Sequence, residues 1–584
     1  MVTILLAMLA CDLNGADAPP PPTAPVDETS PPDDTPGDTP TDGSGTDSTG
    51  GTDSTSDTDG AGEADAPPTM APMRLLFRAS LDLRGVRPSL AEIEAVEADP
   101  AAVEGLIDGF LLDPRFSERV VSLYSEIYLT RLDSYYVKAS DYELDDEPTF
   151  AASVGQEPLR ILAHIAENDL PYTDIVTADW TMADETLAAA WNLDYVNDSA
   201  DDSADDSGWQ QARYTDERPA AGILSTNSMW WRYMSTASNA NRGRANAVSR
   251  ILLCSDFLER PVEFDRDVNL LDEDAVNEAL KSNPGCVSCH YALEPLASYF
   301  WGFYYFDYDS FLDTTDYHPE RELLWEDYSE IAPGYFGEPG YSLSDLGRQL
   351  AGDARFPQCA VEQAYSLLLQ RDVTLDDTDR LNDLRSTFLD AELRMRPLIR
   401  AVLDSPEYRA GPSDDERYVA WKLSGPDLLG TQLEALTGFR WAHNGYDMLS
   451  TDTVGLRILA GGVDGRFVAA PADAPTATMV LVLERLAEAA AEYGVQRDMD
   501  SPEEARLFTE VDFTETPDTD PEAMTAQVQR LHLLLFGERV DADGQEVEAN
   551  LALWQELYAI DRSPASAWSG LLSALIRDPR FLFY

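Results

Sequence analysis

Residues 101–116 read "AAVEGLIDGFLLDPRF", and this stretch indicates a helical fold. Its large apolar residues recur at spacings of three and four, as they do on one face of an amphipathic helix. They are Val103, Leu106, Ile107, Phe110 and Leu111. The stripe ends at Asp-Pro-Arg-Phe (113–116), because a proline interrupts the hydrogen bonding of a helix. The stretch therefore predicts one short helix with a defined end.

The same order of elements recurs at residues 364–409 and 530–584. Both end in a Pro-x-aromatic string, and the string at 578–581 is again Asp-Pro-Arg-Phe. The copies are unequally spaced, which argues for reused helical-hairpin units rather than a solenoid of fixed period. We therefore predict a mainly α fold.

Local capping signals support the same fold class. Ser89 and Glu92 have the spacing of a capping box, in which each side chain bonds the backbone amide of the other residue. Thr374 and Asp377 form a second candidate cap with the same spacing.

The chain has 584 residues, which is too many for one hydrophobic core, so several domains are expected. Its net charge is −66, with only three lysines (Lys138, Lys281 and Lys422). A charge of this sign repels phosphate groups and excludes nucleic acid as a partner.

The N-terminus predicts export. A short apolar run ends in Met-Leu-Ala-Cys (8–11), as in a lipoprotein signal peptide whose cysteine, here Cys11, becomes lipidated. Spanning a bilayer takes about 20 apolar residues, more than this run has. Residues 12–72 are rich in Pro, Gly, Ser, Thr and Asp and carry 14 acidic and no basic residues, which predicts a disordered tether. We expect a cell-envelope protein, periplasmic or surface-exposed, held to the membrane by a lipid anchor.

Composition and repeats together predict six parts along the chain. They are a lipoprotein signal peptide (1–11), a disordered acidic linker (12–72), an N-terminal helical unit (73–130), a central segment (131–360), a second helical unit (361–412) and a C-terminal helical domain (413–584).

The central segment contains Cys-Val-Ser-Cys-His, which has the pattern of covalent c-type haem attachment. Cys286 and Cys289 would form the two thioethers, and His290 would be the proximal iron ligand. Because this attachment takes place outside the cytoplasm, the predicted signal peptide is consistent with it. The aromatic stretch 298–311 and the arginines Arg242, Arg244 and Arg250 are candidates for walling the haem and pairing its propionates, or for ordinary packing and ion pairs.

The sixth iron ligand is open. No methionine lies between His290 and Met395, unlike the usual arrangement in small cytochromes c. The candidates are His318, Met229, Met234 and Met448. Two strong ligands would favour electron transfer, whereas a five-coordinate iron would favour small-molecule binding or peroxidase-like chemistry.

Two other readings of the cysteines compete with haem. A redox disulfide between Cys286 and Cys289 is the second, and a zinc site, for which a second ligand pair is missing, is the third. Cys254 and Cys359 remain, and in an oxidising compartment they are expected to form a disulfide with each other.

Several segments, taken in order, carry a resemblance. They are 79–100, 106–129, 218–229, the run "RANAVSRILLC" (244–254), "CVSCHYALEPLASYFWGFYYFD" (286–307), 346–374, 423–438, 530–541 and 575–584. In this order they resemble the planctomycete- and myxobacterial-type cytochrome-like proteins of uncharacterised function, over most of residues 73–584. The resemblance implies an exported, mainly helical protein with a c-type haem segment and no established reaction.

Two functions from different classes follow. The first is an exported, lipid-anchored, cytochrome-like protein in electron transfer or another oxidoreduction, with a redox partner that the residues do not identify. The second is a non-catalytic surface lipoprotein with structural disulfides, serving assembly or binding.

Overall fold

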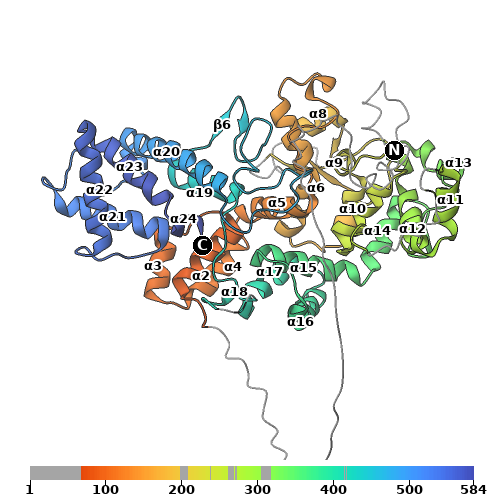
Figure 1. The fold of residues 1–584 in the computed structure, drawn as a ribbon, viewed down its shortest axis with the longest axis horizontal. Helices are drawn as coiled ribbons and strands as arrows, with labels where there is room; N and C mark the ends of the chain where they lie inside the picture. The colour runs from red at the N-terminus through yellow and green to blue at the C-terminus, as the bar shows by residue number, and fades with distance from the viewer. Residues whose placement is uncertain are drawn as a thin grey trace, which may run out of the picture. The chain divides into compact units, whose positions relative to one another are not determined.

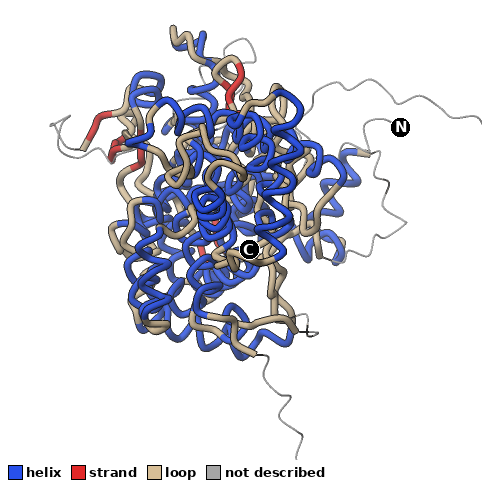
Figure 2. Tube along the Cα trace, turned by 90° about the vertical axis from the view of Figure 1, so that its left-hand side faces the viewer, coloured by secondary structure: helices blue, strands red, loops and turns tan. Residues whose placement is uncertain are grey.

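The computed structural model describes residues 68–196, 208–236, 239–260, 269, 272–303, 317–413, 415 and 417–584. Cys11, the rest of the predicted signal peptide and residues 12–67 of the predicted linker lie outside this part of the chain. The described part is mainly α-helical, with a few short strands (Figures 1 and 2). The predicted fold class is therefore confirmed.

The N-terminal helices form where the apolar spacing predicts them. They are α2 (Pro72–Arg84), α3 (Leu90–Ala98), α4 (Ala102–Phe110) and α5 (Arg115–Tyr128). The predicted capping box at the start of α3 is confirmed: the Ser89 hydroxyl accepts from the Glu92 amide at 3.3 Å, and the Glu92 carboxylate accepts from the Ser89 amide at 2.7 Å. Pro114 caps α5, so the proline that ends one helical stripe also begins the next helix.

The middle of the chain is built from short helices and small sheets. Its helices are η1 (Ala139–Tyr142), α6 (Glu147–Glu167), α7 (Asp174–Thr177), α8 (Glu185–Trp191), η2 (Gly222–Ser225), α9 (Asn227–Arg232), α10 (Arg242–Leu253), α11 (Glu273–Ser282), α12 (Pro284–Ala297), η3 (Ser298–Phe303), η5 (Pro319–Arg321), α13 (Trp325–Tyr328) and α14 (Leu343–Gly352). Most of α6 is buried, and it packs against α5, α8, α9 and β1.

The strands pair only with near neighbours in sequence. They are β1 (Thr181–Ala183), β2 (Asp194–Tyr195), β3 (Gln210–Arg213), β4 (Gly334–Tyr335), β5 (Glu338–Pro339), β6 (Ala442–His443) and β7 (Tyr446–Asp447). The sheet order is β1-β3-β2, antiparallel, with Thr181 opposite Ala212. The β6–β7 hairpin turns through Asn444-Gly445, both at positive φ, as tight two-residue hairpins require.

The remaining helices follow from residue 355 onward. They are α15 (Arg355–Leu369), η6 (Leu375–Asp377), α16 (Thr378–Asp390), α17 (Met395–Leu403), α18 (Pro406–Arg409), α19 (Pro426–Thr437), α20 (Ala477–Asp500), η7 (Pro502–Glu504), α21 (Pro521–Phe536), α22 (Gln545–Asp561), α23 (Pro564–Ile576) and α24 (Pro579–Leu582). None of the described helices is long and apolar enough to cross a membrane.

Two large hydrophobic clusters organise these helices. The first runs from Met70 to Tyr408, with Leu533 added from α21. The second runs from Leu423 to Leu582. Side chains from the predicted units 73–130, 131–360 and 361–412 therefore share one core, and the C-terminal helices have a core of their own.

Arginines fold back onto aspartates two residues earlier at several turns. In Asp113/Arg115 and Asp578/Arg580, the arginine Nε and Nη2 atoms donate to the carboxylate, and the Arg115 Nε–Asp113 Oδ1 distance is 2.9 Å. We call this two-point contact an Asp–Arg clip. The same clip joins Arg355 to Asp353 and Arg417 to Asp415. The planar guanidinium suits this bidentate contact. It explains why Asp-Pro-Arg-Phe recurs: the clip holds the turn while the following aromatic is buried.

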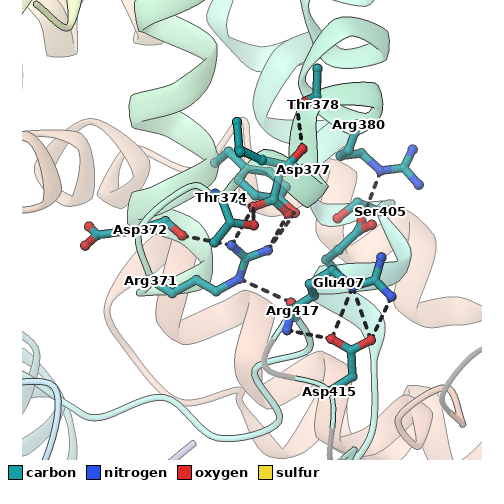
Figure 3. Close-up of polar contacts among 12 residues, drawn as sticks. Arg371, Asp372, Thr374, Asp377, Thr378, Arg380, Ser405, Glu407, Asp415 and Arg417 are labelled. Carbon is teal, nitrogen blue, oxygen red and sulfur yellow. Dashed lines mark hydrogen bonds and ion pairs between the residues drawn. The ribbon is translucent and has the colours of Figure 1, made fainter. Parts of the chain in front are cut away.

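The predicted cap at Thr374 and Asp377 is confirmed, and it is part of a larger polar group (Figure 3). Arg371 donates to both oxygens of the buried Asp377 carboxylate, at 2.6 and 2.8 Å. The Arg371 Nε atom also donates to the carbonyl of Arg417 at 3.2 Å. The turn between α15 and α16 is thereby attached to the segment that leads to α19.

A buried ion pair connects distant parts of the chain. Lys422 is 1% exposed and bonds Asp82 of α2. The Asp82 carboxylate also accepts from the hydroxyls of Tyr408 at 2.7 Å and Tyr584 at 2.8 Å. Because every partner of Asp82 comes from another segment, this cluster forms only when α2, the 408–422 segment and residue 584 have come together.

Candidate functional site

The Cys-x-x-Cys-His string opens helix α12. The Asn283 side chain accepts from the Gly285 amide at 3.0 Å and caps the helix, and Pro284 occupies its first turn. Proline is favoured there because its fixed φ suits a helix and the missing N–H has no helical partner anyway. The sequence Asn-Pro-Gly therefore starts the helix that presents the thiols.

Both thiols and the imidazole share one side of α12. Cys286, Cys289 and His290 stand at positions i, i+3 and i+4, which are neighbours on a helix surface. Cys289 is 9% exposed, and Cys286 and His290 are partly buried. Both cysteines are free thiols in the structure. The arrangement thus brings together the three groups that the sequence predicts for haem attachment.

The imidazole of His290 is held by a carboxylate one turn along the helix. Its Nδ1 atom lies 2.6 Å from Oε1 of Glu294. The Arg242 Nε atom donates to the same oxygen, also at 2.6 Å. With Nδ1 donating to a carboxylate, the lone pair of the neutral ring is on Nε2, which is how metal-binding histidines are commonly oriented.

The charges around Glu294 agree with a proton on Nδ1 of His290. Burial on its own would raise the pKa of Glu294, but the hydrogen bond from His290 and the charge of Arg242 bring it below its ordinary value. Glu294 is therefore an anion at neutral pH and can only accept. Burial raises the pKa of the Cys286 thiol, which stays protonated at neutral pH.

The walls around α12 come from several elements. The helix packs against α10 and α11, which lie beside it in Figure 1, and against β4 and η3. In η3, Phe300 and Phe303 pack against Trp230 with ring centroids 4.6 and 5.9 Å apart, so this part of the predicted aromatic wall belongs to the first core. Residues 304–311 of that stretch lie outside the described residues.

The candidate sixth ligands are dispersed. Met229 is buried in α9 beside Trp230, and Met234 is partly buried after that helix. The His318 Nδ1 atom lies 3.2 Å from the Glu320 carboxylate. Met448 follows β7, and its backbone bonds Trp441 and Leu456, which pack on the second core. The first core holds Cys289, so the structure does not bring Met448 to α12.

The remaining predicted partners have structural contacts. Arg242 bonds Glu294, Arg244 donates to the carbonyl of Tyr233 at 3.0 Å, and Arg250 donates to the hydroxyl of Tyr233 at 2.7 Å. Cys254 and Cys359 are joined by a disulfide, which links the end of α10 to α15. In the described part of the chain, no group of three or more His, Cys, Asp or Glu side chains is placed to hold a metal ion.

Glu294 is the residue of this site that the sequence interpretation missed. Its signal was present, since a glutamate four residues after a histidine on a helix faces it. Arg242 stands 52 positions earlier, and only the packing of α10 on α12 brings it to Glu294.

No protein-family model, curated protein or solved structure matches this chain.

Proposed function

We propose that this chain is an exported, lipid-anchored, c-type-cytochrome-like protein that carries one haem on α12 and takes part in electron transfer or another oxidoreduction. The observation that supports this proposal best is the pair of contacts that joins His290 and Arg242 to the Glu294 carboxylate. It fixes the imidazole with Nε2 as the nitrogen able to bind iron, next to two free thiols at the attachment spacing.

Four residues of α12 would have separate roles in holding the haem. Cys286 and Cys289 would each add their S–H across a vinyl group of the porphyrin, forming two thioethers without a leaving group. His290 would supply the proximal nitrogen, and Glu294 would keep the ring oriented and electron-rich. When bound, the haem would supply one-electron chemistry, which no side chain of the site provides.

The sixth ligand decides between the two kinds of reaction. His318, Met229 and Met234 remain the candidates near the first core, and an open sixth position is the alternative. Lipidation of Cys11 would attach the protein to the membrane, with residues 12–72 as the tether to an unidentified redox partner. The charge of −66 favours a partner with a basic surface and not nucleic acid.

Expression in a host that exports proteins and carries haem-maturation machinery tests the proposal. We expect a Soret band that stays with the polypeptide after denaturation and acidic organic extraction. The Cys286→Ala and Cys289→Ala double variant should lose it, and a Cys254→Ala and Cys359→Ala variant should keep it. An unmodified wild-type polypeptide with no Soret band would favour the surface lipoprotein without a redox role.

A further inference from the structure

A cavity of about 1030 Å³ lies away from α12, between α5, α15 and the segments 419–428 and 457–473. None of its lining residues belongs to the candidate haem site. Small-molecule sites in proteins range from about 300 to 1,000 Å³, so its size suits a ligand and not only water.

One face of α5 gives the cavity a polar stripe. Arg119, Ser122 and Glu126 are spaced at i, i+3 and i+7, and all three line the cavity. The Arg119 Nη1 atom donates to the Ser122 hydroxyl at 3.1 Å, and that hydroxyl donates to the Asp427 carboxylate at 3.1 Å. The first two members of the stripe therefore already have partners within the protein.

Glu126 differs from these residues. Within the described part of the chain, its carboxylate makes no hydrogen bond and no salt bridge, although it is partly buried in the cavity wall. The charged groups that face it are Arg119, Arg131, Asp427 and Lys422. Arg131 and Asp427 form a salt bridge with each other. Lys422 forms one with Asp82, which is not part of the lining.

The other charges of the lining are mostly negative. Arg457 pairs with Asp452 at 2.8 Å, and Arg371 pairs with Asp377 at 2.6 Å. Besides Glu126, four acidic residues line the cavity and form no salt bridge within the described residues: Glu259, Glu362, Asp372 and Asp473. Arg119 is the one guanidinium of the lining without a carboxylate partner there. Unpaired acids therefore outnumber unpaired bases, which favours a positively charged ligand.

Much of the rest of the lining is apolar, although Ser125, Gln363, Ser366 and Gln370 also line the cavity. The apolar lining residues include Leu123, Ile127, Leu367, Val373, Leu428, Val463 and Met479. A ligand that fills the cavity would therefore bury hydrocarbon against these side chains, worth about 25 cal/mol per Å² of apolar area.

We propose that this cavity binds an organic cation with an apolar body, such as an alkylammonium, with Glu126 as its counter-ion. The ammonium group would donate hydrogen bonds to the Glu126 carboxylate, and the hydrocarbon would lie between α5 and α15. A bound cation would give Glu126 the partner that the protein itself does not provide.

Binding of this kind is coupled to release of a proton. Burial raises the pKa of Glu126 to about 7, with the nearby positive charges opposing and Asp427 adding to the shift. The cation needs the ionised carboxylate, so affinity should rise by about tenfold between pH 6 and pH 8, as the ionised fraction does. Burial also lowers the pKa of Lys422 to about 7, and its loss of charge favours the cation over the same range.

Isothermal titration calorimetry with octylamine, octanol and octanoate, which share one chain length, tests the proposal. We expect saturable binding of octylamine to the full chain and much weaker binding of the other two. Glu126→Gln should weaken octylamine binding at least tenfold at pH 8 and flatten its pH dependence. Asp473→Asn, at the exposed rim, should change it less than threefold.

Equal affinity of octylamine for wild type and Glu126→Gln would overturn the proposal. Tighter binding of octanoate would overturn it in favour of an anion held by Arg119. Ile127→Trp, which fills the apolar part of the cavity and keeps Glu126, should also abolish binding. A folded Ile127→Trp variant that binds octylamine normally would place the ligand elsewhere.

Discussion

His290 and Glu294 are joined by a contact of 2.6 Å between the imidazole Nδ1 atom and a carboxylate oxygen, one helical turn apart on α12. Arg242 reaches the same oxygen from α10. The two ring nitrogens therefore differ: Nδ1 bonds Glu294 within the protein, and Nε2 is the nitrogen able to bind a ligand.

Replacing Glu294 with leucine should release the imidazole. In the protein without haem at pH 8, the ¹⁵N shifts of His290 should change from one tautomer, protonated on Nδ1, to a mixture of both. Glu320→Leu is the matched control, since Glu320 contacts Nδ1 of His318 at 3.2 Å. It should leave the His290 signals unchanged. A mixture of tautomers already present in wild type would contradict the orienting role of Glu294.

The disulfide should stabilise the first core. Its cysteines are 105 positions apart, and for a loop of that length chain entropy predicts a stabilisation of about 4–5 kcal/mol. The Cys254→Ala and Cys359→Ala double variant should therefore unfold at clearly lower urea concentration. In protein without haem, the Cys286→Ala and Cys289→Ala double variant should not. Thiol titration of the unreduced, denatured body should find two free thiols, and four would refute the pairing.

Lys422 should titrate far below an ordinary lysine. Burial lowers its pKa to about 7, while Asp82 opposes the shift. Between pH 7 and 10 the unfolded chain then binds more protons than the folded one, so this group makes stability rise with pH. Lysine-selective ¹³C labelling should show a signal with a midpoint near 7 that is absent in Lys422→Met. A midpoint near 10.4 would show that the ion pair outweighs desolvation.

The same rise of stability with pH should appear in unfolding experiments. A variant with both Asp82→Asn and Lys422→Met lacks this titration, so wild type should gain stability relative to it from pH 7 to pH 9.5. Each pKa unit of the shift corresponds to about 1.4 kcal/mol. Parallel stability curves for the two proteins would contradict the assignment.

Asp377 should matter far more than Asp415, although each contacts an arginine in Figure 3. Asp377→Asn should destabilise the protein by about 1–3 kcal/mol at pH 7, because the largely buried Arg371 guanidinium loses its charged partner. Asp415→Asn, at the exposed end of the group, should have little effect.

The effect of Asp377→Asn should depend on pH. Burial opposes ionisation of Asp377, but bonds from Arg371 and Thr374 lower its pKa well below the ordinary value. The stabilisation by the ionised Asp377 carboxylate is therefore present above about pH 4 and is lost as the pH falls further. The difference in unfolding free energy between wild type and Asp377→Asn should shrink in acid. A constant difference down to pH 2 would contradict this.

The features that sequence predicts here are those in which near neighbours decide the structure. The stripe from Val103 to Leu111 and the Ser89–Glu92 box involve contacts within a few residues, and both form. The Asp113–Arg115 clip is equally local, but neither the apolar periodicity nor the capping spacing predicts it.

Most of the other features that the sequence did not predict depend on distant pairs. Nothing near Glu126 in sequence shows that α15 and the 457–473 segment enclose it. Glu294 could be inferred from its spacing to His290, but Arg242 could not. Nor could the sequence show which distant segment lies opposite His290, on which a sixth ligand of the proposed haem would depend.

The Asp82 cluster limits how early in synthesis the first core can close. Asp82 is made early, but its partners at Lys422 and Tyr584 are made 340 and 502 positions later. Until then, α2 holds a buried carboxylate without its counter-ion, which opposes premature closure of the first core. A chain shortened before residue 422 would keep this carboxylate without its counter-ion, and we expect it to be cleaved by proteases more readily than the chain of 584 residues.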